Sequence, residues 1–317
     1  MDLNKYLNQS NTEAPVQGEQ RMSKEEYAAM KKQERDETWA EVDAKAQDVF
    51  KDGKSLKGFL DFMVQCAPQR AVNLLLLYSQ NPQIRQVKTM EKITKEGHSL
   101  KPEARGKGYR FFAKSEYEKD GVMMQGNPVV KAYDISQIRM KQPEEQSPKS
   151  IDELMEALLT NADVRIQIAE NLPENVQAQY IPNQRTIFVK NGMGEVTTFH
   201  AISRELSCAS MDMHDGSYSR AKASAPAYCA AYVIAQKYGI DNSAFSFDKV
   251  CQLQENGAKD PKELRGFVND VKNAAYSIEK HIDRNLGRPE QEFVADEFSV
   301  GEGKKGKTAK SKPQPER

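Results

Sequence analysis

Residues 141–149 place the strongest constraint on how this chain can fold. They read KQPEEQSPK, a polar stretch with two prolines and no hydrophobic periodicity. Because proline lacks a backbone N–H and restricts the residue before it, neither a helix nor a central strand can run through this stretch. The sequence therefore predicts a linker at 141–149, with one domain at 50–140 and a second at 150–285.

Polar sequence flanks the two domains. We expect residues 1–49 to form a disordered start and then a highly charged, solvated helix beginning near Lys24. Residues 286–317 are rich in Lys, Gly and Pro, and we expect them to form a disordered tail.

Neither the apolar runs nor the cysteines indicate a membrane protein or a secreted one. The longest apolar run, at 71–78, is too short to cross a bilayer, and the start of the chain lacks the charge pattern of a signal peptide. The cysteines have no paired metal or redox spacing; they are Cys66, Cys208, Cys229 and Cys251. We therefore expect a cytoplasmic protein with reduced thiols and no membrane association.

Hydrophobic patterning predicts an α+β chain. The first domain should contain helices at 55–66 and 69–79, separated by Pro68, and strands at 108–114 and 121–133. The second should be mainly helical with a small sheet. It begins with a capping box formed by Ser150 and Glu153. A hairpin at 177–181 and 186–189 then precedes helices at about 195–211, 219–238 and 261–285.

The second domain contains the segment FHAISRELSCA, at 199–209, which has the frame of an HExxH zinc-peptidase helix without its histidines. In an active helix of this kind, two histidines four residues apart bind zinc and the glutamate acts as general base. Those positions are Arg204, Glu205 and Cys208 here. Arg204 would repel a metal ion, and Glu205 would have no metal-bound water to activate. We therefore expect no metal and no cofactor, and we expect Glu205 to form an ion pair with Arg204 or Arg220.

Helix geometry limits the other residue sets that could hold a metal or act as a nucleophile. His200 and Cys208 are eight residues apart on one predicted helix, about 12 Å along its axis, so they cannot share one ion. Cys208, His214 and Cys229 could converge only with help from the loop at 212–219, and a Cys208–His214 nucleophilic pair stays open. We expect Cys208 and Cys229 to be small buried residues on packed helices.

The net charge of zero hides a basic block in the first domain. Residues 81–114 contain nine Lys or Arg against three Glu, with aromatic residues among the last cations. Cations neutralise phosphates and exposed rings stack on unpaired bases, so this block is a candidate site for single-stranded nucleic acid. The predicted contacts are Arg85, Lys88, Lys95, Lys101, Arg105, Lys107, Tyr109, Arg110, Phe112 and Lys114.

Strand geometry limits how many of these rings can be exposed. In a strand that starts at Gly108, Tyr109 and Phe111 share one face, whereas Arg110 and Phe112 share the other. We therefore expect at least one ring to belong to the core. The alternative for the whole block is a solvated charged surface.

The order of four short motifs resembles the N-terminal single-stranded-DNA-binding domain of ArdC-type antirestriction proteins. The motifs are NLLLLYSQNP at 73–82, EGH at 96–98, KGYRFF at 107–112 and AYDISQ at 132–137. The resemblance covers roughly residues 50–140. The family usually has a tryptophan shortly before the basic loop, where this chain reads MEKI at 90–93.

Residues 150–285 resemble the zincin-like peptidase domain that follows in those proteins, in the variant found in LtrC-like proteins of conjugative elements. The matching segments are YIPNQRTI at 180–187, FHAISRELSCA at 199–209 and AYCAAYVIAQKYGID at 227–241. The resemblance places the family's third ligand, a glutamate, at about Tyr228. All three ligand positions, Arg204, Cys208 and Tyr228, would then be degenerate.

Together these resemblances imply a protein of a mobile genetic element that binds single-stranded DNA without sequence specificity. It would protect or chaperone that DNA, and its zincin-like domain would be a pseudoenzyme with a possible protein partner. Two alternatives stay open. One is an active metallopeptidase with an unusual metal site, and the other is a protein-interaction scaffold that does not bind DNA.

Overall fold

The computed structural model describes residues 23–66, 69–119, 122–141 and 147–288. The predicted disordered start at 1–22, most of the predicted linker and the tail from residue 289 lie outside the described residues. The chain divides into two units, Met1–Glu37 and Thr38–Arg317, and each is described by itself.

Helices and small sheets together make up the described chain, which confirms the α+β class. The helices are α2 Lys24–Val49, α3 Gly53–Gln65, α4 Ala71–Gln80, α5 Met90–Lys95, α6 Ile151–Leu159, α7 Glu195–Ser210, α8 Arg220–Tyr238, α9 Asp248–Leu253 and α10 Pro261–Asn285. The strands are β1 Val87–Thr89, β2 Ser99–Leu100, β3 Tyr109–Phe112, β4 Ser115–Lys119, β5 Val122–Gly126, β6 Val129–Asp134, β7 Ile138–Arg139, β8 Arg165–Ala169, β9 Ala178–Ile181 and β10 Thr186–Lys190. Four short 3-10 turns join them: η1 Pro102–Ala104, η2 Ile135–Gln137, η3 Pro182–Gln184 and η4 Glu255–Gly257.

The first unit contains the beginning of α2. A reciprocal pair of bonds caps the helix, because the Glu26 N–H donates to Ser23 Oγ at 3.1 Å and the Ser23 N–H donates to Glu26 Oε2 at 2.8 Å. Lys31 and Glu34, one turn apart, form an exposed ion pair at 2.6 Å. This part of α2 is the solvated helix that the sequence predicts.

The rest of α2 is not solvated, which corrects that prediction from Thr38 onward. Thr38, Val42, Ala46 and Val49 recur every three or four residues and are almost completely buried. That spacing places them on one helix face, which packs into the core. The Trp39 ring also contributes, with its centroid 4.8 Å from that of Phe112.

Helices α3 and α4 confirm the predictions at 55–66 and 69–79, and α4 packs on β3 of a three-stranded sheet with the order β1-β6-β3. The predicted strand at 108–114 is β3. The predicted strand at 121–133 is instead two strands, β5 and β6, because Pro128 between them has no N–H to donate to a ladder. Strand β5 pairs with β4, which the sequence analysis did not predict.

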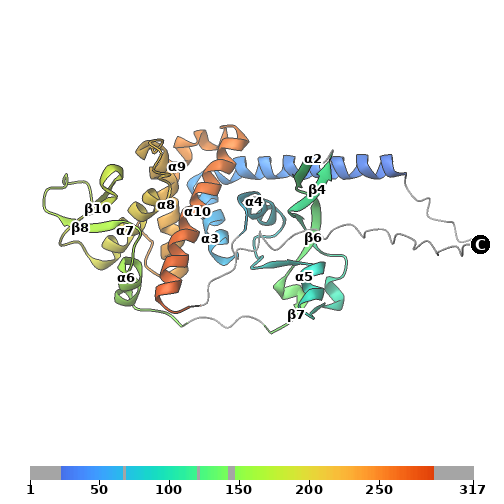
Figure 1. Cartoon of the computed structure of the whole chain (residues 1–317), viewed down its shortest axis with the longest axis horizontal. Helices are drawn as coiled ribbons and strands as arrows, with labels where there is room; N and C mark the ends of the chain where they lie inside the picture. The colour runs from blue at the N-terminus through green and yellow to red at the C-terminus, as the bar shows by residue number, and fades with distance from the viewer. Residues whose placement is uncertain (1–22, 67–68, 120–121, 142–146, 289–317) are drawn as a thin grey trace, which may run out of the picture. The chain divides into compact units, whose positions relative to one another are not determined.

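A second three-stranded sheet has the order β8-β10-β9, in which β10 runs parallel to β8 and antiparallel to β9. The predicted capping box of Ser150 and Glu153 starts α6, and the predicted hairpin is β9 and β10. Helix α7 packs on β9 and β10 and also against α8 (Figure 1). Gly239, with φ of 72°, ends α8 in a left-handed conformation that glycine adopts without strain.

One hydrophobic core includes residues from both sides of the predicted linker. Helix α3 packs on α8 and α9, and the rings of Phe50 and Phe267 lie 5.1 Å apart in an edge-to-face arrangement. The Tyr232 hydroxyl of α8 donates to Asp61 of α3. The predicted domain boundary at 141–149 therefore stays a prediction. Residues before and after it pack into the same hydrophobic core. In the part of the chain that the structure describes, no helix is long and apolar enough to span a membrane.

Candidate functional site

Two side-chain amides of α4 occupy the edge of β3 that does not pair with β6. Asn73 accepts from the Phe112 N–H at 2.9 Å and donates to the Phe112 carbonyl at 3.0 Å. Gln80 makes the same pair of bonds with the backbone of Arg110, at 2.8 and 3.0 Å. The amides take the place of a neighbouring strand and satisfy backbone groups that would otherwise lack partners. The Asn and Gln of the motif at 73–82 thus position β3.

Both ends of the loop at 101–108 are hydrogen-bonded to the same residue, Gln137. The Lys101 N–H donates to the Gln137 carbonyl at 2.9 Å, and the Gln137 side chain donates to the Lys107 carbonyl at 3.0 Å. Within the loop, the Lys107 N–H donates to the Ala104 carbonyl at 3.0 Å. At Gly108, a Cβ would lie 3.0 Å from the Cβ of Lys131, so the close approach of the chain to β6 favours glycine there.

Asp134 and Gln137 explain the motif at 132–137. The Asp134 side chain accepts from the N–H of Ser136, while the Asp134 N–H donates to the Gln137 side chain, in a capping box. Asp134 is buried and also accepts from the N–H groups of Arg85 and Gln86, at 2.9 and 3.1 Å. The motif therefore ties β6 to the start of β1 and orients Gln137 toward the basic loop.

The predicted DNA-contacting cations fall into two groups, those that form an ion pair with another residue and those that do not. A first group consists of exposed or half-exposed cations that make no ion pair with any described residue; its members are Arg85, Lys95, Lys101, Arg105 and Lys107. Lys88 is paired with Glu96 at 2.5 Å, and Arg110 is paired with Glu41 of α2. Lys114 is exposed but also interacts with another residue, so it does not belong to the first group. The unpaired cations of the first group have the most charge to offer a phosphate.

The predicted rings also divide. Phe112 is 1% exposed and packs against Trp39, so it is a core residue and not a stacking ring, which corrects its place among the predicted contacts. The reason is that α2 and α4 cover β3. Tyr109 is half-buried, and its hydroxyl accepts a hydrogen bond from Asn81 at 2.9 Å. Tyr109 is the predicted ring that keeps accessible surface.

Two exposed cations that sequence reasoning missed lie beside the loop. Lys131 of β6 is directly opposite Arg110 of β3, and its Cβ lies against Gly108. Arg139 of β7 pairs with Ser99, two residues before the loop begins. The register of the two predicted strands could have identified Lys131, because antiparallel pairing of those strands brings it opposite Arg110. We define the basic surface as Lys101, Arg105, Lys107, Lys131 and Arg139.

In the second domain, Glu205 is fully buried and both of its oxygens are occupied. It accepts from both Nη atoms of Arg220, the Nη2 bond measuring 2.7 Å, and from the Tyr180 N–H at 2.8 Å. Arg204 Nε lies 3.3 Å from Oε1. The predicted ion pair is confirmed with both arginines. The hydrogen bonds that Arg220 donates to Glu205 raise the pKa of the Arg220 guanidinium further above its already high value.

Cys208 and Cys229 are fully buried between packed helices, as predicted. Burial raises the pKa of the Cys208 thiol to about 11 and raises that of Cys229 as well, so both stay protonated at neutral pH. The ring of His214 lies 3.5 Å from the Asp212 carboxylate. Within the described residues, no three His, Cys, Asp or Glu side chains lie together as a metal ion would need.

Two of the three positions that the sequence resemblance aligns with metal ligands share a pocket. Arg204 of α7 and Tyr228 of α8 line a cavity of about 220 Å³, together with His200. Cys208 does not line it. Arg204 of α7 therefore lines the cavity, whereas Cys208 of the same helix is buried in the core.

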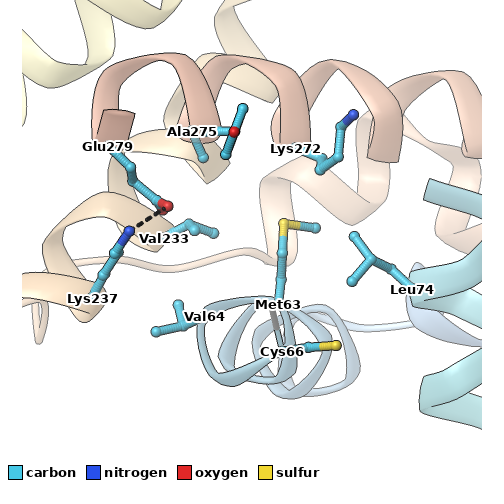
Figure 2. A pocket seen from close by; sticks show the side chains of 10 residues that line it. Met63, Val64, Cys66, Leu74, Val233, Lys237, Lys272, Ala275 and Glu279 are labelled. Atoms are coloured by element: carbon cyan, nitrogen blue, oxygen red, sulfur yellow. Dashed lines mark hydrogen bonds and ion pairs between the residues drawn. The ribbon is translucent and has the colours of Figure 1, made fainter. Parts of the chain in front are cut away.

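A smaller space lies between α3, α8 and α10 (Figure 2). Lys237 and Glu279 form an ion pair at 2.9 Å on one side of it, and Met63 and Cys66 lie on the other. Its volume of about 30 Å³ is enough for one or two water molecules. It is therefore a packing void and not a ligand site.

Comparisons with known proteins give a likeness among solved structures only. No family model and no curated protein matches the chain. The chain is similar to the metal-free crystal structure of the antirestriction protein ArdC from the R388 plasmid, with 11% identity, 77% of this chain and 98% of that one covered, and a TM-score of 0.46. It is also similar to the Mn(II)-bound structure of that protein, with 12% identity, coverages of 76% and 97%, and a TM-score of 0.49.

Proposed function

We propose that this protein binds single-stranded DNA, without sequence preference, through its basic surface. The observation that supports this most directly is the loop at 101–108. Lys101, Arg105 and Lys107 lie on it, and none of them pairs with a carboxylate of the described chain. Unpaired cations release counterions from the phosphates they contact, which favours binding to nucleic acid of any sequence.

The rigidity of the loop supports the same function. Both of its ends are bonded to Gln137, so its backbone is ordered before any ligand arrives. A ligand then does not have to offset the cost of ordering that backbone. Tyr109, a half-buried residue next to the end of the loop, would supply the ring on which an unpaired base stacks. A duplex keeps its bases stacked internally, so this contact favours a single strand.

The zincin-like part is proposed to be catalytically inactive. Both oxygens of Glu205 are engaged by arginines and by a backbone N–H, so its lone pairs are not directed at a substrate. Arg204 brings a positive charge to a position where a peptidase would need a metal ligand. Following the resemblance found in the sequence, the DNA would be that of a mobile element, which the protein protects or chaperones.

Binding is tested by fluorescence anisotropy with labelled single-stranded and duplex oligonucleotides at several salt concentrations. We expect tighter binding to the single strand, affinity that falls as salt rises, and loss of binding in Arg105→Glu/Lys107→Glu. Lys222→Glu/Lys262→Glu changes the same charge at exposed positions outside the basic surface, so it should bind as the wild type does. Equal weak binding to both forms, or binding that ignores salt or the Arg105/Lys107 change, would reject the proposal.

The competing metallopeptidase function predicts a bound metal. Elemental analysis of protein purified without chelator distinguishes the two, because a stoichiometric transition metal would contradict an inactive site. The Glu205→Gln variant then separates catalysis from structure. A residual general base would show as loss of peptide hydrolysis, whereas an inactive site predicts no hydrolysis before or after the change.

A further inference from the structure

The pocket beside Arg204 is lined by both polar and apolar groups. Gln177, Thr197, His200, Arg204 and Tyr228 supply its polar atoms. Its apolar wall comes from Phe245 and from Ala201, Ala231 and Ala244. The Phe245 ring centroid lies 4.9 Å from the rings of both His200 and Tyr228, so three rings pack around one end of the cavity.

The charges around this pocket do not balance. Two guanidinium groups, of Arg204 and Arg220, face the single carboxylate of Glu205. Arg220 bonds to both oxygens, whereas Arg204 uses only Nε, at 3.3 Å. The Nη atoms of Arg204 donate to no described residue. Arg204 is therefore a surplus cation, and it lines the cavity.

His200 and Tyr228 add neutral polar atoms to the same cavity. The Nε2 atom of His200 is buried and has no hydrogen-bond partner in the described structure. Burial lowers the pKa of His200, so the ring is uncharged at neutral pH. The Tyr228 hydroxyl already accepts from the Ser246 N–H at 3.0 Å, which leaves its proton free to donate. Among the lining residues, Arg204 thus carries the full positive charge and the other polar groups are neutral, while the exposed Asp241 carboxylate acts on His200 from outside the lining.

We propose that this pocket binds an organic monocarboxylate, with the carboxylate on the Nη atoms of Arg204 and the apolar part against Phe245. A planar guanidinium matches a carboxylate with two parallel hydrogen bonds. A single surplus charge suits a monoanion better than a phosphate dianion. The volume of about 220 Å³ lies below the roughly 300–1,000 Å³ of pockets for drug-sized ligands, so the bound group has about the size of one amino-acid residue.

This ligand chemistry has two sources, a free small acid or the C-terminal residue of a polypeptide. Neither depends on DNA binding, because the lining residues do not include any member of the basic surface. A negative result for carboxylate binding would therefore not contradict the proposed DNA binding, and a negative result for DNA binding would not contradict carboxylate binding.

The test is calorimetric titration of the full-length protein with N-acetyl-L-leucine and with N-acetyl-L-leucinamide. We expect the acid to bind at one site and the amide to bind about tenfold more weakly or worse, because it loses a charge-assisted hydrogen bond. The tripeptide Ala-Ala-Leu distinguishes the sources. Binding at least as tight as that of the acetylated acid indicates a polypeptide C-terminus, and no binding indicates a free acid.

Variants assign the binding to the pocket. Arg204→Gln should weaken binding of the acid about tenfold or more, and it should keep the fold because Glu205 retains Arg220. Ala244→Leu fills the mouth of the pocket from an exposed position and should also block binding, which keeps the test valid if Arg204→Gln does not fold. Lys222→Gln is the control and should bind normally. Equal binding of acid and amide, no heat at millimolar acid, or wild-type affinity in the pocket variants would overturn the proposal.

Discussion

The side-chain amide of Asn73 and the backbone of Phe112 exchange two hydrogen bonds, of 2.9 and 3.0 Å, between residues that are both buried. Side chains of helix α4 thereby bond to the unpaired edge of β3 in the way that a neighbouring strand would. Gln80 makes the same two bonds with the backbone of Arg110. An edge closed in this way cannot pair with another chain, and it fixes the strand that follows the basic loop.

Replacing Asn73 by alanine leaves the buried Phe112 N–H without a partner, whereas the Phe112 carbonyl keeps its hydrogen bond from Arg70. The free energy of unfolding should therefore fall by about 1–3 kcal/mol, the cost of one buried unsatisfied group. Urea unfolding followed by circular dichroism measures the effect. Gln83→Ala, an exposed amide nearby, is the control and should change stability by less than about 0.5 kcal/mol. Similar losses in the two variants would show that the bonds to Phe112 do not stabilise the fold.

The ion pair of Glu205 and Arg220 should respond asymmetrically to mutation. Glu205 is 0% exposed and Arg220 is 40% exposed, so an orphaned arginine can reach water and an orphaned glutamate cannot. In Arg220→Leu the buried Glu205 keeps only Arg204 Nε and the Tyr180 N–H, so this variant should destabilise the protein by about 3 kcal/mol, the lower end for breaking a buried ion pair, and Glu205→Leu by less. The double variant should lose less than the sum of the two, because neither charge is left unpaired. Thermal and urea unfolding of the three variants measures this, and strictly additive losses would contradict the pairing.

The salt dependence of DNA binding should depend on whether a cation is paired. Lys107→Gln should reduce the slope of log affinity against log salt by about 0.7, the value for one phosphate contact on a single strand. The charge-neutral double change Lys88→Gln/Glu96→Gln should change the slope by less, because Glu96 offsets the charge of Lys88 at 2.5 Å and contacts Lys92 only at 3.8 Å. Anisotropy titrations at four salt concentrations measure both slopes. Equal changes in the two variants would mean that overall charge, and not the basic surface, drives binding.

Stability should fall in alkaline solution because of the buried thiols. Burial raises the pKa of Cys66 to about 12 and that of Cys208 to about 11, whereas a thiol in an unfolded chain has a pKa near 8.5. Above that pH the unfolded chain loses protons that the folded chain keeps. The stabilisation is therefore complete below about pH 8.5 and is lost as the pH rises toward 11 or 12.

Urea midpoints measured from about pH 7 to about pH 10 should show this decline. Cys208→Ala should decline less steeply than the wild type, whatever its stability at neutral pH. Parallel declines would show that other groups cause the effect. In the native state the same thiols should also resist Ellman's reagent, and they should react when the protein is unfolded.

Much of the local structure was predictable because it depends on nearby residues. The capping box of Ser150 and Glu153 and the end of α8 at Gly239 both follow from interactions over a few positions. Strand β8 and helix α9 were missed, although RIQIA at 165–169 alternates in the manner of a strand. The pattern at 121–133 predicts one strand, but Pro128 has no N–H to donate to a ladder and divides it into β5 and β6.

The candidate sites depended on contacts that no local pattern contains. The sequence identified the basic block and expected Glu205 to pair with an arginine. It did not distinguish Lys107 from Arg110, because the partner of Arg110 is Glu41, on a helix far away in the chain. It also missed Lys131, whose position depends on strand register.

The sequence by itself determined the start of α6 at Ser150, the end of α8 at Gly239, the charge of the block at 81–114 and the presence of arginine and cysteine at positions 204 and 208. These properties are set by the covalent chain and by interactions over one or two helical turns. Tertiary structure alone decided that Phe112 is buried while Tyr109 keeps some exposure, and that Arg204 is left as a surplus cation at a pocket. Burial and ion pairing are decided by neighbours that are distant in sequence, and the fold brings those neighbours together.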